Sequence, residues 1–408
     1  MQTETKNTKP FYNTEIPSDW EVRELGEIAF VNMGQSPDSD NYNESGAGLP
    51  LIQGNTDMKN RKSFIRYFTT QLTKVCNEGD LILSVRAPVG NIGEATFKSC
   101  IGRGVCAIKP KKIDKEYLFQ LLIYCEEKWR KIEQGSTFTA VSSEDVRKFK
   151  LVISKSETEQ KAIARVLSTW DEAIHKTEQL IIQKELRKKW LMQNLLTGKM
   201  RLKGFDGEWK EIHLGSLGKT YSGLTGKNKD DFGEGKPYIP YLNIFNNARI
   251  DISNFDYVKI TELDNQNKVR YGDIFFTVSS ETPDEVGMAS VMLEVIDELY
   301  LNSFCFGFRL FNFNTLVPEF SSYFLRAKAF RTEINKLSQG ATRFNLSKNN
   351  LMKLNVVLPP REEQTAIAEV LQAADKEISL LKAKVEKLKE QKKGLMQVLL
   401  TGKVRIKY

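Results

Sequence analysis

Histidine is almost absent from this chain, and long apolar runs are missing altogether. Only His175 and His213 occur among 408 residues, and the five cysteines form no C-x-x-C pair. A zinc site would have almost no ligands to use, so we expect buried, reduced thiols and no metal. The apolar run that begins at Leu118 is far shorter than the roughly 20 residues of a membrane span. The N-terminus also lacks an apolar signal segment, so we expect a cytoplasmic protein with no membrane partner.

Motifs of common enzyme classes are missing as well. The sequence contains no NPPY or DPPY, which an amino-methyltransferase needs, and no G-x-G-x-x-G after a strand. The stretch "GSLGKT" at 215–220 ends like a phosphate-binding loop, but the loop is short and His213 stands where the first glycine belongs. Asp284 and Glu285 could begin a paired-carboxylate nuclease site, but no E-x-K follows them. The sequence therefore predicts no catalytic residues in this chain.

Positive charge is in excess. The formal net charge is +8 and the isoelectric point is about 9.0. A basic protein favours a polyanionic partner, because neutralising phosphates releases counterions. This indication is weak alone, since many basic proteins bind no nucleic acid.

The chain repeats itself at an offset of 204 residues. Between positions 159 and 203, 21 of 45 residues are identical to those 204 positions later, without a gap. Glu159 aligns with Glu363, Gln160 with Gln364 and Asp171 with Asp375. A period this long excludes a solenoid and indicates a two-fold tandem arrangement.

A weaker repeat continues outside these conserved blocks. "WEVRELG" at position 20 resembles "WKEIHLG" at 209, and "GDLILSVRAPVGNIG" at 79 resembles "GDIFFTVSSETPDEVG" at 272. "GSTFTAVSSEDVRKFKLVIS" at 135 likewise resembles "GATRFNLSKNNLMKLNVVLP" at 340. The order is therefore a divergent domain, a conserved block, a second divergent domain and a second conserved block.

Each conserved block is expected to form one long helix. Ser156 and Glu159 have the spacing of a capping box, "PPREEQ" opens the second block, and both blocks end in "LLTGK", whose glycine suits a C-cap. Between these signals only Gly394 interrupts, and no proline occurs. We expect His175 on the solvated face of the first helix.

Apolar residues in the blocks follow the 4,3 spacing of a coiled coil. The second block has Ile367, Leu371, Ala374, Ile378, Leu381, Val385, Leu388, Lys392, Leu395 and Leu399 at these positions. The first has Ile163, Leu167, Trp170, Ile174, Thr177, Ile181, Lys184, Lys188, Leu191 and Leu195. A single apolar stripe needs a partner, so we expect the two helices to pair antiparallel as a spacer between two similar domains. The alternative is ordinary core packing within one globule.

The divergent domains are expected to be α+β. "LILSV", "VCAIKP", "IFFTV" and "FCFGFRLF" have the composition of strands, and residues 115–134 and 318–337 each read as one helix. We expect five segments: a disordered tail at 1–14, a first domain at 15–155, a helix at 156–203, a second domain at 204–360 and a helix at 361–408.

These features resemble the specificity subunit of type I restriction–modification systems. The resemblance rests on "LPPREEQTAIAEVL" with "GLMQVLLTGK", on "WKEIHLG", "YIPYLNI" and "QGATRFNLS" in the second target-recognition domain, and on "LSVRAPVG" and "GSTF" in the first. It covers nearly the whole chain. The first conserved block departs from the pattern at "ISKSETEQ", which lacks the Pro-Pro pair.

The resemblance implies a non-catalytic subunit in which each domain reads half of a split, asymmetric double-stranded DNA target. The helices would set the spacer and dock two modification subunits, which methylate adenine with S-adenosylmethionine. ATP and Mg²⁺ would belong to a separate nuclease subunit where one is present, and no cofactor would bind this chain. Two alternatives stay open: the recognition subunit of a related system with a fused methyltransferase–nuclease, and a coiled-coil scaffold without DNA specificity.

Candidate DNA contacts lie in matched loops of the two domains, where arginine would read guanine, asparagine and glutamine adenine, and lysine would hold phosphates. For each of them the alternative is a solvated loop residue, and Phe138 and Phe344 are expected as core anchors more than as stacking platforms. In the first domain the candidates are Gln53, Asn55, Lys59, Arg61, Lys62, Ser84, Arg86, Ser136 and Thr137. In the second they are Asn243, Asn246, Asn247, Arg249, Thr282, Thr342 and Arg343.

Overall fold

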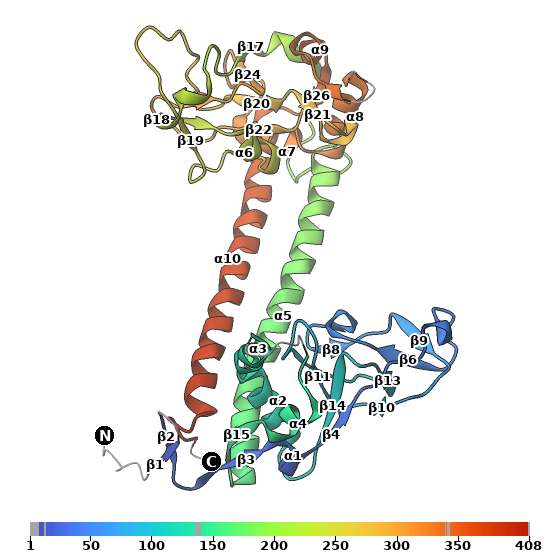
Figure 1. The fold of residues 1–408 in the computed structure, drawn as a ribbon. Helices are drawn as coiled ribbons and strands as arrows, with labels where there is room; N and C mark the ends of the chain where they lie inside the picture. The colour runs from blue at the N-terminus through green and yellow to red at the C-terminus, as the bar shows by residue number, and fades with distance from the viewer. Residues whose placement is uncertain (1–7, 12–13, 135–139, 339, 341–342, 407–408) are drawn as a thin grey trace. The chain divides into compact units, whose positions relative to one another are not determined.

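The computed structural model divides into two compact units (Figure 1). Unit 1 comprises Met1–Glu178 with Ala383–Tyr408, and unit 2 comprises Gln179–Lys382. The structure describes all residues except 1–7, 12–13, 135–139, 339, 341–342 and 407–408. Each long helix thus contributes one part to each unit, which the expected division at 156–203 and 361–408 did not anticipate.

Unit 1 is built on two sheets. The larger runs in the order β4 (Ala29–Met33), β14 (Val105–Pro110), β11 (Leu81–Ser84), β12 (Ile92–Glu94), β8 (Lys62–Ser63) and β7 (Met58–Lys59). The second runs in the order β10 (Val75–Cys76), β13 (Ser99–Ile101), β6 (Leu49–Ile52), β9 (Tyr67–Thr69) and β5 (Tyr42–Asn43). Two further pairs join β3 (Trp20–Glu24) to β15 (Lys150–Ser154), and β1 (Thr8–Phe11) to β2 (Thr14–Pro17). Residues 8–11, expected in a disordered tail, therefore form a strand.

The helices of unit 1 cover one face of the larger sheet and are α1 (Leu25–Ile28), α2 (Lys115–Tyr124), α3 (Glu126–Gln134) and α4 (Ser143–Lys148). The side chain of Asp114 caps α2 by accepting the N–H of Tyr117 at 2.9 Å. We expected one helix over 115–134. That prediction was wrong, because Cys125 leaves the helical region at φ −90° and ψ 2° and starts a new helix direction.

Unit 2 also has two main sheets, each with fewer strands than its counterpart in unit 1. One sheet runs in the order β17 (Gly218–Ser222), β24 (Cys305–Leu310), β20 (Ile274–Thr277) and β22 (Ala289–Val291). Another runs in the order β19 (Asp256–Val258), β18 (Phe232–Ile239) and β23 (Tyr300–Leu301). The remaining pairs are β16 (Lys210–His213) with β26 (Asn355–Leu358), and β21 (Ser279–Ser280) with β25 (Phe344–Asn345). The helices are α6 (Tyr241–Asn246), α7 (Pro318–Phe324), α8 (Lys328–Leu337) and α9 (Lys348–Met352). The single helix expected over 318–337 is again two, because Ala327 is extended.

The weaker sequence repeat is confirmed as a structural repeat. The order β4-β14-β11-β12 of unit 1 matches β17-β24-β20-β22 of unit 2, and the parallel pair β13–β6 matches β23–β18. The Gly-Asp turn before the central strand is also the same. Gly79 and Gly272 have φ of 83° and 82°, and the carboxylates of Asp80 and Asp273 each accept an N–H from three residues earlier at 2.8 Å.

The conserved blocks form the two long helices, α5 (Glu157–Leu195) and α10 (Arg361–Leu399). Each ends shortly before the glycine of "LLTGK", and Gly198 and Gly402 have φ of 69° and 70°, as the C-cap prediction requires. One hydrogen bond of the expected capping box is present. The hydroxyl of Ser156 accepts the N–H of Glu159 at 3.3 Å, while the Glu159 carboxylate turns inward.

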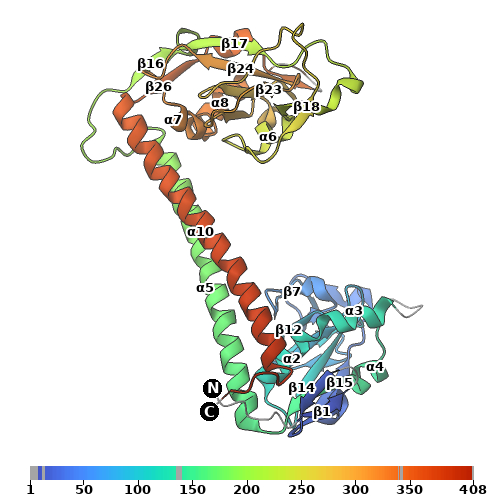
Figure 2. The same cartoon turned by 90° about the vertical axis from the view of Figure 1, so that its left-hand side faces the viewer.

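Within each unit α5 and α10 run side by side in opposite directions (Figures 1 and 2). In unit 1 the Nζ of Lys392 lies 2.7 Å from both carboxylate oxygens of Asp171, and in unit 2 Lys188 pairs with Asp375 at 2.5 Å. The expected apolar positions are buried or half-buried, and His175 is exposed, as predicted. No helix in the described parts of the chain is both long and apolar enough for a membrane span.

The conserved glutamates anchor each domain to its helices. In unit 1 the buried carboxylate of Glu159 accepts from the indole N–H of Trp20 at 3.0 Å and the hydroxyl of Ser154 at 2.5 Å, and it pairs with Arg405. In unit 2 Glu363 accepts from the indole N–H of Trp209 at 3.1 Å and pairs with Arg201 at 2.5 Å. Arg405 and Arg201 are themselves 204 positions apart. The second conserved block therefore supplies the arginine that binds the glutamate of unit 1, and the first block supplies the arginine that binds the glutamate of unit 2.

The conserved glutamines have matched roles too. The side chain of Gln160 accepts the N–H of Asp114 at 2.9 Å, next to the start of α2. The side chain of Gln364 accepts the N–H of Val317 at 2.9 Å, next to the start of α7. Some residues that are identical in the two blocks thus contact the domains, while others join the two helices.

Candidate nucleic-acid interface

Four segments meet beside the end of the central strand of unit 1. The N–H of Gly102 donates to the carbonyl of Ile52 at 2.8 Å, which brings the end of β6 to the loop between β13 and β14. The N–H of Val85 donates to the carbonyl of Gly104 at 2.9 Å. The N–H of Val141 donates to the carbonyl of Val85 at 2.9 Å, and Arg86 forms a bridge with Ala140. We call this meeting of residues 52–55, 84–86, 102–104 and 140–141 junction 1.

Unit 2 repeats the arrangement bond for bond. The N–H of Asn302 donates to the carbonyl of Ile239 at 3.2 Å, and the N–H of Val278 donates to the carbonyl of Phe304 at 3.3 Å. The N–H of Leu346 then donates to the carbonyl of Val278 at 2.8 Å, and β21 pairs with β25 beside it. Residues 239–242, 278–282, 302–304 and 343–346 form junction 2. The sequence predicted matched loops, and the structure brings the described ones together.

The described candidates of unit 1 lie at junction 1, on a hairpin or, in the case of Ser84, inside the domain. Gln53, Asn55 and Arg86 lie at junction 1, and Arg86 is exposed. Lys59, Arg61 and Lys62 lie on the exposed hairpin of β7 and β8, which turns through Asn60 and Arg61 at positive φ. The Arg61 guanidinium is held on Glu126 and donates to the carbonyl of Ile92 at 3.1 Å. Its two neighbouring lysines have no ion-pair partner in the described part of the chain.

Ser84 faces inward. Its side chain is buried, and its hydroxyl contacts the carbonyls of Arg86 and Pro88 at 2.9 and 2.7 Å. The hydroxyl therefore holds the shape of the turn that carries Arg86 and does not reach outward. The sequence could not show this, because a serine at the end of a strand can point to either face of the sheet.

The described candidates of unit 2 are either exposed or turned into the domain. Asn246, Thr282 and Arg343 are exposed, and Thr282 and Arg343 flank the paired strands β21 and β25 of junction 2. Asn243 is buried, donates to the carbonyls of Asp251 and Asn254 at 2.8 and 2.7 Å, and accepts from two further groups. All its hydrogen-bonding capacity is used inside the loop, so it supports the fold of the loop.

Arg249 and Asn247 are also turned inward. The guanidinium of Arg249 lies over the ring of Tyr323 at 4.7 Å, and the Tyr323 hydroxyl donates to Asp375 on α10 at 2.7 Å. The side-chain amide of Asn247 donates to the carbonyl of Asn243 at 3.0 Å. Arg249 thus connects the loop after α6 to α10 through Tyr323, and Asn247 holds that loop to α6. Ser136, Thr137, Phe138 and Thr342 lie outside the described residues, while Phe344 packs partly buried against the core, as predicted.

Two half-buried arginines fix the loops beside junction 2. Arg326 donates to four carbonyls, including those of Ile244 and Asn247 at the end of α6, at 2.6 and 2.8 Å. Arg331 donates to the carbonyls of Gly287 and Val286, both at 2.6 Å. Burial, with Arg331 nearby, lowers the pKa of Arg326 to about 10, which still leaves it charged at neutral pH. Sequence reasoning missed both residues, since nothing in their spacing distinguishes a capping arginine from a surface one.

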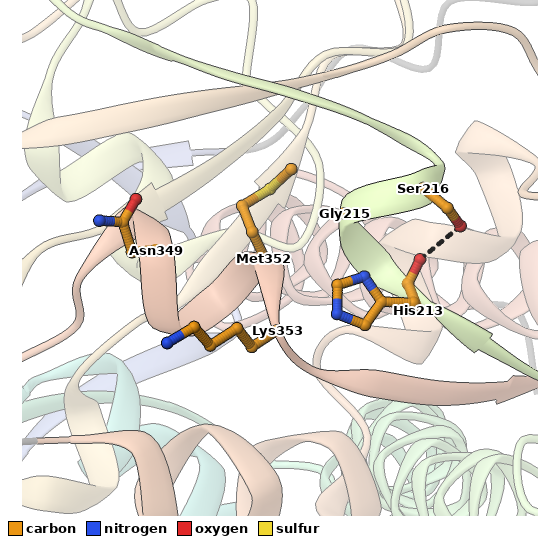
Figure 3. A pocket seen from close by; sticks show the side chains of 6 residues that line it. All are labelled: His213, Gly215, Ser216, Asn349, Met352 and Lys353. Carbon is orange, nitrogen blue, oxygen red and sulfur yellow. Dashed lines mark hydrogen bonds between the residues drawn. The ribbon is translucent and has the colours of Figure 1, made fainter.

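A shallow surface depression in unit 2 is lined by His213, Gly215, Ser216, Asn349, Met352 and Lys353 (Figure 3). The Ser216 hydroxyl donates to the backbone carbonyl of His213 at 2.6 Å, so it does not contact the imidazole as a catalytic pair would. The stretch "GSLGKT" that begins here enters β17 and is followed by no helix N-terminus. It therefore lacks the architecture of a phosphate-binding loop.

The carboxylates considered for a nuclease have structural roles. Asp284 accepts from the amide of Asn335 at 2.8 Å, and Glu285 accepts from the hydroxyl of Ser280 at 3.3 Å. Among the described residues no cluster of three histidine, cysteine or acidic side chains could hold a metal ion. The geometry at both places is that of loop stabilisation.

Comparisons with known proteins agree with this architecture. A family model described as the type I restriction modification DNA specificity domain matches residues 17–184 and 206–390. A Methanocaldococcus jannaschii protein provisionally named the type I restriction enzyme MjaX specificity subunit is 40% identical over 204 residues, which are 49% of this chain and 48% of that protein. The chain thus spans about half of that relative. The MjaVIII specificity subunit of the same organism is 25% identical over 98% of this chain and 97% of its own length.

Solved structures share the fold. The specificity subunit of the type I restriction–modification system from M. genitalium covers 96% of this chain and 98% of its own, with a TM-score of 0.56 and 16% identity. A structure that describes assembly and conformational transition of the type I system covers 97% and 100%, with a TM-score of 0.62 and 17% identity. With two matching domains and two long helices, the chain belongs to the type I restriction–modification specificity family and is the DNA specificity subunit of such a system, in which catalysis resides on the other subunits.

Proposed function

We propose that junction 1 and junction 2 each read one half of a split DNA target, and that the two half-sites differ. One observation carries this proposal: the two junctions share their backbone hydrogen bonds and present unlike side chains. Junction 1 offers Gln53, Asn55 and Arg86, while junction 2 offers Thr282 and Arg343 with Asn246 nearby. A common scaffold with different exposed groups suits reading different bases, so the target should not be a palindrome.

The other candidates receive supporting roles. Lys59 and Lys62 extend from the exposed hairpin of unit 1 and suit phosphate contacts, with Arg61 holding the hairpin against Glu126. Ser84, Asn243, Asn247 and Arg249 shape the loops from inside. Ser136, Thr137 and Thr342 stay predictions from the sequence. A role on the chromosome would place the protein in the cytoplasm.

We further propose that the helices dock two modification subunits, which carry S-adenosylmethionine, and nuclease subunits with ATP and Mg²⁺ where these are present. Helix α5 supports this with an exposed apolar stripe of Ile182, Leu186 and Trp190, in which Leu186 is 62% exposed. Residues four apart lie on one helix face, so the stripe can pack against a partner helix.

A methylation map tests the proposal. This chain would be co-expressed with its cognate modification subunit, and the host DNA would be sequenced for N6-methyladenine against cells with the modification subunit alone. We expect a new split motif that is methylated on both strands and depends on this chain. Arg343→Ala should relax the second half-site and leave the first intact.

Two alternative outcomes are informative. If the same motif appears only with a fused methyltransferase–nuclease partner, the chain serves that related system. If the complex assembles but no motif appears, and its binding to DNA is weak and insensitive to salt, the chain is a scaffold without specificity, because phosphate contacts would make binding depend strongly on salt.

A further inference from the structure

The loop between β13 and β14 in junction 1 is held rigidly on both sides of one residue. Gly102 has Cα of Gln53 at 3.2 Å from the place where a Cβ would stand, and Gly104 has the carbonyl oxygen of Gln53 at 2.1 Å from that place. Gly104 has no room for a side chain, and Gly102 is tightly packed against Gln53. Arg103 lies between them, and its N–H donates to the hydroxyl of Ser36 at 3.1 Å. The backbone of this loop is thus fixed against the end of β6 and the start of the Arg86 turn.

The side chain of Arg103 is unused by the fold. It is exposed, and its guanidinium has no hydrogen-bond or ion-pair partner within the described parts of the chain. Other arginines in the domains, such as Arg326, Arg331 and Arg249, are tied to carbonyls or rings. A free guanidinium on a rigid backbone is well suited to base reading, because little further ordering of the loop is needed.

The matching loop of unit 2 is equally rigid and carries different chemistry. The side-chain amide of Asn302 donates to the carbonyl of Ile239 at 3.0 Å, and its oxygen accepts the N–H of Phe304 at 2.8 Å. The Asn302 side chain thus adds bonds that the glycine at position 102 cannot make. Phe304 occupies the place of Gly104, because its carbonyl accepts the matching bond from Val278, and its side chain is 70% exposed.

We propose that this loop specifies one base in each half-site, by a guanidinium in unit 1 and by an apolar ring in unit 2. Arg103 donates to O6 and N7 of a guanine in the major groove, and Phe304 packs on the methyl group of a thymine. The inference rests on the proposed function, since it assumes that the junctions face DNA. It adds Arg103 and Phe304, neither of which the repeat alignment had identified.

The test is in vitro methylation of a DNA library degenerate at every half-site position, with the complete complex of this chain and its modification subunit. Arg103→Ala should lower the preference for guanine at one position of the first half-site by about tenfold or more, and leave the second half-site unchanged. Phe304→Ala should lower the preference for thymine at one position of the second half-site only. Arg130→Ala on α3 and Phe311→Ala, both at exposed sites outside the junctions, are matched controls and should leave the motif unchanged.

Arg103→Lys separates base reading from a phosphate contact. Lysine keeps the charge but loses the planar fork, so base reading predicts reduced discrimination, while a phosphate contact predicts wild-type discrimination. If Arg103→Ala weakens methylation of all sequences equally and lowers the salt dependence, the guanine assignment is overturned. An unchanged motif overturns it also. A wild-type complex that yields no split motif would instead contradict the proposed function itself, and for each variant the retained half-site of the other unit shows that the complex has assembled.

Discussion

Unit 1 and unit 2 agree in their buried charges and differ in their exposed loops. In both units a buried glutamate binds a tryptophan and an arginine. In both, an aspartate–lysine pair also joins the two helices, and each residue of one pair lies 204 positions from the same residue type in the other pair. The exposed loops differ in chemistry, as Gly104 in unit 1 and Phe304 in unit 2 show. The two units therefore share the contacts between domain and helix, and the exposed side chains at the junctions differ.

The largest expected effect comes from removing the anchoring glutamates. Glu159→Ala should destabilise unit 1 by on the order of 3 kcal/mol, because it leaves the buried indole N–H of Trp20 and the Ser154 hydroxyl without this acceptor and leaves Arg405 paired with Asp19 alone. Glu363→Ala should cost about 2 kcal/mol in unit 2, where Trp209 is less buried and Pro359 stands in place of the serine. Hydrogen exchange followed by mass spectrometry would report each unit separately. Equal losses in both units for either variant would contradict the matched-anchor model.

The cross-helix pairs should give the next largest effect. Asp171→Ala leaves Lys392, whose side chain is 10% exposed, without its partner, and we expect a loss of about 2 kcal/mol. Asp375→Ala should cost less at its lysine, because the Lys188 side chain is 25% exposed. Adding Lys392→Met to Asp171→Ala should restore most of the stability, since no unpaired charge is left behind. Denaturant unfolding of the single and double variants provides the measurement, and absence of rescue would argue against the ion pair as the cause.

The two helices can be compared through their exposed faces. The positions on α10 that match Ile182, Leu186 and Trp190 are Glu386, Glu390 and Gly394. Leu186→Glu should weaken assembly with the modification subunit by about tenfold, the cost of losing one buried leucine. The matched change Glu390→Gln on α10 should have little effect. Titration of the labelled chain with the modification subunit measures both, and equal weakening would show that the stripe is not the contact.

The smallest effect should appear on acidification. Hydrogen bonding from Arg405 holds the pKa of Asp19 below its usual value of 3.8, and in unit 2 Arg201 donates to the carbonyl of Gly207 instead of a second carboxylate. A lowered carboxyl pKa contributes stability above about pH 3.8 that is lost as the pH falls below it. Unit 1 should therefore lose the contribution of the Asp19–Arg405 pair below this pH. Asp19→Asn should remove that contribution, which comparison of the acid unfolding curves of the wild-type chain and the variant would detect.

The helices and the strands were predictable from the sequence because their signals are local. The apolar spacing of α5 and α10, the glycines at 198 and 402 and the strand segments of both domains all have direct physical meaning. The breaks at Cys125 and Ala327 were missed, since tertiary contacts decide where an apolar helical stretch changes direction.

The candidate site was predictable only in part. Loop positions could be matched by alignment, but whether a polar side chain points outward depends on its partners. Asn243 and Asn246 differ in this way within one short helix, and Ser84 differs from Arg86 two residues on. Glu159 and Arg405 could have been predicted as an ion pair from the repeat. Both charged residues are identical in the two copies, and a charged residue on a solvated surface would be free to differ between them.

The position of Arg405 bears on the order in which the protein is completed during synthesis. Unit 2 is one continuous stretch, Gln179–Lys382, so all its contacts can form once that stretch has left the ribosome. Unit 1 starts first but needs Ala383–Tyr408, and until Arg405 arrives Glu159 has no cationic partner. The domain translated first is thus the one finished last. A nascent chain would hold an open first domain beside a closed second one, and a premature stop near the end of the message would disable the domain encoded at its beginning.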